Sequence, residues 1–207
     1  ALAGAGAACA MMGKYWSIFL IGGLVIAALA DSRRAAYFRS AAPWITIVVG
    51  AIVLTPHIVW LYQHDFAPFH YAAGIHGEKP FAETARSALG YLAGSIGYVA
   101  VPVIIALAAG RPDRATLADM IWPAEADRRL AAATFWAPLL LPVVAALVSG
   151  ADITSLWSMS AWTLLPVLLL SPAGVTISAV DTRRLLAFAV VFPFAMLIAS
   201  PVILHFR

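Results

Sequence analysis

The sequence predicts an all-α membrane protein, a polytopic transmembrane helical bundle of about six spans. Hydrophobic residues make up 63% of the chain and charged residues only 11%, whereas soluble domains are about 45–50% apolar and about 25% charged. The mean hydropathy is +0.91. Apolar stretches of about twenty residues recur along the chain, which is the length that crosses a hydrocarbon core about 30 Å thick. We therefore treat residues 1–207 as a single transmembrane domain.

The predicted spans are residues 11–30, 43–62, 88–109, 130–149, 160–179 and 185–204. We expect helices because backbone groups in lipid must form their hydrogen bonds within the spanning segment. Residues 1–10 would be the end of an earlier helix or a short re-entrant piece. The chain opens inside an apolar stretch, without a basic leader. We therefore expect it to be an internal piece of a longer polytopic protein.

The basic residues alternate between the connectors. Connectors 31–42, 110–129 and 180–184 together carry nine arginines, against Lys79, Arg86 and Arg207 on the other side. The positive-inside rule predicts that the arginine-rich connectors are cytoplasmic. The tryptophans near both predicted boundaries are typical of interfacial aromatic belts.

Lys14 is the only charged residue in the first thirty positions. A lysine at the centre of a membrane helix costs roughly 2.5–3.5 kcal/mol on insertion scales. Lys14 is sixteen residues from Ala30, roughly 24 Å along a helix, which places it near the outer leaflet. Two interpretations are open: the lysine snorkels to the interface, or it binds a phosphate or carboxylate. The neighbouring Gly13 and the pair Tyr15 and Trp16 favour a helix break in a packed site.

The five histidines map to the same outer half of the predicted bundle. His57 lies within the second span, behind Pro56, and is predicted to be a packed polar residue near a kink. The others on this side follow in the long outer connector 63–87, apart from the terminal His205. That connector contains His64, Asp65, His70 and His76.

The outer connector has three possible roles. It can be an ordinary hydrated loop, a functional loop of the kind long connections often form, or a metal site. Its histidine spacing matches no familiar ligand motif, so a divalent metal stays only an alternative. Arg86, just outside the third span, is either an interfacial anchor or a phosphate ligand.

The composition supports neither a disulfide-stabilised domain nor a nucleic-acid-binding protein. A single cysteine, Cys9, rules out an internal disulfide. The arginines occur in short pairs between apolar runs, which forms no nucleic-acid-binding face.

Several segments resemble the membrane glycosyltransferases of family 39. The similar segments are residues 10–15 (AMMGKY) with the following apolar run and Arg-Arg connector, 42–44 (APW), 55–60 (TPHIVW), 63–66 (QHDF) and 155–166 (SLWSMSAWTLLP). Lys14 and the segment 60–65 (WLYQHD) are the most specific parts of this resemblance. The family includes protein O-mannosyltransferases, the lipid A aminoarabinose transferase and rhizobial lipopolysaccharide galacturonosyltransferases.

The resemblance implies a GT-C fold and an enzyme of a bacterial inner membrane. Such an enzyme transfers a sugar from a polyprenyl-phosphate donor to a lipid, glycan or protein acceptor at the outer, periplasmic face. It implies that Lys14 binds the donor phosphate, with Arg86 as a second cation. His57, His64, Asp65 and His70 would line the outer-face site. The family's catalytic base is an acidic residue in a loop that would lie upstream of Ala1, so the piece alone is expected to be inactive.

This chain departs from many relatives at Gly13, where they carry Thr or Ser before the lysine. Two other function classes stay open. A transporter or flippase for a lipid-linked or anionic substrate also uses intramembrane lysines, and a membrane scaffold would leave Lys14 merely snorkelling.

Overall fold

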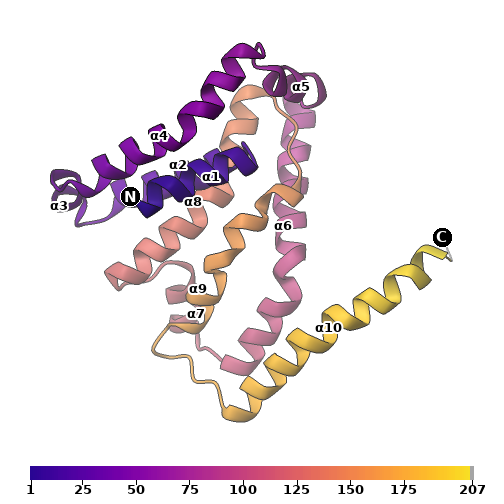
Figure 1. Ribbon diagram of the computed structural model, residues 1–207. Coiled ribbons are helices and arrows are strands. Elements are labelled where there is room, and N and C mark those ends of the chain that lie inside the picture. Colours follow the sequence, from indigo (N-terminus) through magenta and orange to yellow (C-terminus); the bar gives the residue numbers. More distant parts are fainter. Residues whose placement is uncertain (206–207) are drawn as a thin grey trace.

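The computed structural model describes residues 1–205, with side chains through Pro201. Arg207 and the side chain of His205 lie outside the described residues. The described residues form helices joined by turns and short irregular segments, and no strand occurs among them. In chain order the helices are α1 (Leu2–Gly13), α2 (Ser17–Ala30), α3 (Arg34–Arg39), α4 (Ala42–Gln63), α5 (Ala67–Ile75), α6 (Phe81–Gly110), α7 (Arg114–Ile121), α8 (Ala126–Ser149), the 3₁₀ helix η1 (Ser155–Leu164), α9 (Leu165–Leu170) and α10 (Ala179–His205) (Figure 1).

Four helices are long and apolar enough to cross a membrane, namely α4, α6, α8 and α10. They contain the predicted spans 43–62, 88–109, 130–149 and 185–204. The all-α membrane class is therefore supported by the structure. The prediction of six continuous spans is wrong at the other two segments.

The predicted span 11–30 is two helices joined at a sharp turn. Helix α1 ends at Gly13, Lys14 is extended, and α2 begins at Ser17. Residues Ala3 and Ala7 of α1 line the same groove as Leu24 and Ala28 of α2. That pairing places the start of α1 beside the end of α2, so the two helices form an antiparallel hairpin with Lys14 at its turn.

The predicted span 160–179 is also interrupted. Residues 155–164 form the 3₁₀ helix, α9 adds six residues, and the chain leaves the helix at Ser171. Local polar bonds accompany the 3₁₀ segment, since the Ser158 hydroxyl donates to the Ser155 carbonyl at 2.8 Å. Pro172 then has no backbone N–H with which to continue the helical hydrogen bonds.

Helix α8 is the centre of the fold and contacts α2, α6, η1 and α9. Its buried residues recur at alternating spacings of three and four, so they form one continuous face. They are Ala132, Phe135, Leu139, Pro142 and Ala146, with Pro138 beside them. Helix α6 buries Thr84, Ala88, Tyr91 and Ser95 at the same spacing, as left-handed helix packing requires.

Glycines allow two close helix approaches. A Cβ built on Gly23 of α2 would lie 2.4 Å from the Pro138 ring of α8, and one on Gly4 of α1 would lie 2.1 Å from the Thr46 carbonyl oxygen of α4. Small residues let backbones approach in this way when lipid provides no hydrophobic drive between helices.

The two ends of the bundle differ in chemistry. At one end Arg33 bridges Asp31 and Asp127, and Arg128 donates to the Ser171 hydroxyl, so connectors 31–42 and 110–129 meet there. At the opposite end the Lys14 turn meets α4, α5 and η1. We call these the arginine end and the lysine end.

Helix α10 extends away from the other helices in Figure 1. None of the residues in its apolar window is buried within the described chain. Its whole circumference is therefore available to lipid or to another part of the protein.

Substitution of Gly23 tests the close α2–α8 contact. We expect Gly23→Ala to lower the free energy of unfolding by about 1–3 kcal/mol, because the added methyl group overlaps the Pro138 ring. Thermal unfolding in detergent measures the change. Gly6→Ala is the matched control, since a Cβ there meets nothing within 4 Å. Equal stabilities for both variants would contradict the contact.

Candidate functional site at the lysine end

Lys14 lies at the turn of the α1–α2 hairpin with an exposed side chain. Its backbone N–H donates to the Ala10 carbonyl at 2.9 Å, and its carbonyl accepts from Ser17 N–H at 2.9 Å. Among the described side chains, no carboxylate lies within ion-pair distance of its ammonium group. The lysine is therefore presented as a free cation at this end.

Helix α2 begins directly beside this cation. The backbone N–H groups of Tyr15 and Trp16 have no acceptor among the described residues. Free N–H groups and the helix dipole make the start of a helix attractive to anions. An ammonium and two N–H groups next to each other form a site suited to a phosphate.

Aromatic packing fixes the turn. The Tyr15 hydroxyl is 2.9 Å from His57 Nε2, and the Tyr15 ring stacks on His57 and on Phe69, with centroids 5.7 and 4.9 Å apart. Trp16 packs on Trp157 of η1 at 4.1 Å. Three other elements thus hold the turn in place, and His57 is a packed polar residue.

The remaining outer-connector residues do not meet at one point. His64 stacks on Trp60 and its Nδ1 lies 2.8 Å from the Trp60 carbonyl oxygen. His76 packs edge-on against Trp157. For His70 and Asp65 the structure gives no polar side-chain contact among the described residues, and both are exposed. His57 is therefore the only one of the four predicted outer-face residues with a described contact to the Lys14 turn.

The segment between α4 and α5 carries backbone strain. Asp65 and Phe66 have φ angles of 50° and 52°, in the left-handed region. This conformation is tolerated by Asp but is an outlier for a bulky residue such as Phe. These two residues turn the chain between α4 and α5, and Phe69 of α5 then stacks on Tyr15.

The described residues contain no group of three or more His, Cys, Asp or Glu side chains able to hold a metal ion. The described residues of the outer connector therefore provide no cluster of ligand side chains for the alternative of a metal site.

Arg86 lies in a separate pocket of about 460 Å³ between α6 and the segment after α8. Glu83, Tyr91 and Asp152 also line this pocket, and Lys14 does not. Ser155 of η1 forms one wall, two residues from Trp157. The two predicted phosphate cations thus belong to separate sites, each of which contacts η1.

A hydrogen-bonded ion pair forms the floor of the Arg86 pocket. The Lys79 ammonium donates to Asp152 Oδ2 at 2.7 Å, and the Ser87 hydroxyl donates to Oδ1 at 2.6 Å. Ile153 N–H in turn donates to Ser87 Oγ at 3.0 Å. Hydrogen bonds from Lys79 and then from Ser87 lower the pKa of Asp152 below its ordinary 3.8.

Sequence reasoning found Lys14 and the break beside it, but missed Tyr15 as the partner of His57 and Asp152 as the partner of Lys79. Asp152 is the only charged residue of its connector, which was the available signal. Its partner is 73 positions away, and no pattern in one sequence specifies such a pairing.

Comparisons with protein-family models, curated proteins and solved structures find no match to this chain.

The Asp152 cluster predicts an acid-sensitive contribution to stability. A carboxyl whose folded pKa is lowered stabilises the fold above its unfolded pKa, and this contribution disappears as pH falls through the folded pKa. We expect Asp152→Asn to lose about 1–2 kcal/mol at pH 7, allowing for partial exposure of the pair. The difference from wild type should shrink as the pH falls below the ordinary carboxyl pKa and through the lowered folded pKa of Asp152.

Unfolding midpoints in detergent between pH 7 and pH 3 check this expectation. Asp65→Asn serves as the control, because Asp65 is exposed and makes no ion pair in the described structure. The role of the cluster would be refuted if Asp152→Asn lowered the free energy of unfolding at pH 7 no more than Asp65→Asn does.

Proposed function

We propose that this chain is the membrane portion of a glycosyltransferase that uses a polyprenyl-phosphate sugar. The sugar passes to a lipid, glycan or protein acceptor at the outer face of a bacterial inner membrane. The arginine end then faces the cytoplasm. The observation that carries the proposal is the Lys14 ammonium beside the start of α2, which has no carboxylate partner among the described side chains.

The chemistry of such a reaction needs a cation near the lipid head groups. When the sugar leaves, negative charge grows on the departing phosphate oxygens. A preorganised ammonium and backbone N–H groups stabilise that charge best where water is scarce. The aromatic side chains of Tyr15, Trp16, Phe69 and Trp157 pack around the turn, which fixes the position of Lys14 and supports this role.

Arg86 takes a neighbouring role in this proposal. Its pocket holds a guanidinium and the Glu83 carboxylate beside an ordered ion pair, a mixture suited to the hydroxyl and charged groups of a sugar or glycan. We assign Arg86 to anion binding there.

Lys14→Ala should lower transfer from a polyprenyl-phosphate sugar by about 10²–10³-fold, the usual effect of removing one preorganised group that stabilises transition-state charge. Lys14→Arg should retain part of the activity. Arg114→Ala is the matched control, because it removes a cation from the arginine end. The assay uses the whole membrane protein, with insertion checked separately. Near-wild-type turnover by Lys14→Ala would exclude the phosphate role.

The discontinuous α1–α2 pair favours one alternative, a transporter or flippase for a lipid-linked or anionic substrate. Transporters often use broken helices whose starts point at an anionic group. Proteoliposomes containing a fluorescent polyprenyl-phosphate sugar separate the two functions. Translocation of the intact lipid without sugar transfer would favour the transporter.

A further inference from the structure

An apolar groove of about 590 Å³ lies among α1, α2, α3, α4 and α8. Its walls are formed mainly by alanine, leucine, isoleucine and valine side chains, for example Ala7, Leu24 and Ile47. A groove of this size and lining, open to the side of a membrane bundle, accepts a hydrocarbon chain.

Charged residues line this groove only where α2 meets α3, at the arginine end. They are Asp31, Arg33 and Arg34. Arg33 donates to both carboxylate oxygens of Asp31 and also pairs with Asp127 at 2.7 Å. These bonds satisfy Arg33 and Asp31, and Arg33 holds the pKa of Asp31 at about 2, so Asp31 stays charged.

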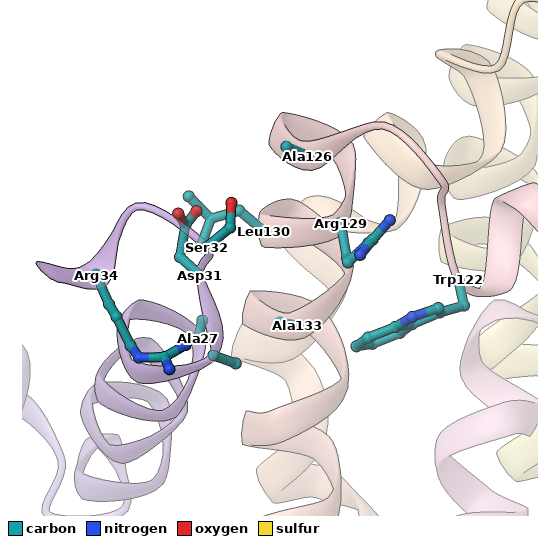
Figure 2. Close-up of a pocket in the computed structure, with 10 residues that line it drawn as sticks. Ala27, Asp31, Ser32, Arg34, Trp122, Ala126, Arg129, Leu130 and Ala133 are labelled. Atoms are coloured by element: carbon teal, nitrogen blue, oxygen red, sulfur yellow. The ribbon is translucent and has the colours of Figure 1, made fainter.

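Arg34 is different, because no carboxylate pairs with it among the described side chains. Figure 2 shows its side chain running from the start of α3 back along α2 to the level of Ala27. The exposed Arg34 side chain thus lies beside the groove that it lines. Arg34 also lines a second hollow of about 230 Å³ between the end of α2 and the start of α8.

We propose that the groove holds an acyl chain of an anionic phospholipid whose phosphate is bound by Arg34. An unpaired cation next to an apolar slot matches the two halves of such a lipid, and guanidinium groups bind phosphate oxygens in a bidentate manner. Basic pockets between membrane helices recognise anionic head groups on the same physical grounds. The competing arrangement is an Arg34 that interacts only with the carbonyl end of α2.

This site is independent of the Lys14 site. Helix α2 separates them, with Lys14 beside its start and Arg34 just beyond its end. Anionic lipid binding at Arg34 therefore does not require the proposed sugar transfer, and failure of either proposal leaves the other standing.

Native mass spectrometry of the intact, detergent-extracted protein tests the site. We expect phosphatidylglycerol to bind about tenfold more tightly than phosphatidylcholine. A ratio of this size corresponds to the free energy of one additional charge-assisted hydrogen bond. Arg34→Gln should bring that ratio close to one, and Arg34→Lys should keep most of it. Arg39→Gln is the matched control, because Arg39 is an exposed arginine of the same short helix that does not line the groove.

A second variant tests the groove itself. Ala28→Leu narrows the slot between α1 and α2, so it should weaken binding of both lipids while leaving their ratio unchanged. An unchanged ratio in Arg34→Gln overturns the proposal and leaves Arg34 as a partner of the α2 end. Displacement of phosphatidylglycerol by equimolar polyprenyl phosphate also overturns it, since the groove would then belong to the sugar donor.

Discussion

The contact between α2 and α8 at Gly23 and Pro138 positions both the Lys14 turn and the apolar groove. Without a side chain on Gly23, α2 lies directly against the proline ring of the central helix. The start of α2 then carries the Lys14 turn, and its end carries Asp31 and Arg34. Displacement of α2 would therefore move the lysine site, the groove and the Arg33 ion pairs together.

The two ends of α2 are stabilised by different physical means. At the lysine end, aromatic stacking and a Tyr15–His57 hydrogen bond hold the turn while leaving the ammonium free. At the arginine end, carboxylates neutralise Arg33 and leave Arg34 available. In both places one cation has no carboxylate partner among the described side chains, while neighbouring side chains are held by specific contacts.

The sequence predicted the helical membrane class and four of the spans because length and apolarity are properties of a continuous segment. It could not place the ends of the other two. Gly13, Tyr15 and Trp16 indicated a break, but only contacts with α4 and η1 convert that break into a reversal of direction. Similarly, the apolar residues 160–179 resemble a span by composition, although 3₁₀ geometry and Pro172 interrupt them. Lys14 and Arg86 could be selected as cations, whereas their separation into two sites depends on where η1 packs.

The length of α2 has a consequence for the surrounding membrane. Its 14 residues extend about 21 Å, whereas the hydrocarbon core is about 30 Å thick. A helix of this length that crosses a bilayer creates hydrophobic mismatch, which the bilayer relieves by thinning locally at a cost of fractions of a kcal/mol per ångström. Such thinning beside α2 would draw lipid phosphates from both leaflets inward, toward Lys14 at one end and Arg34 at the other.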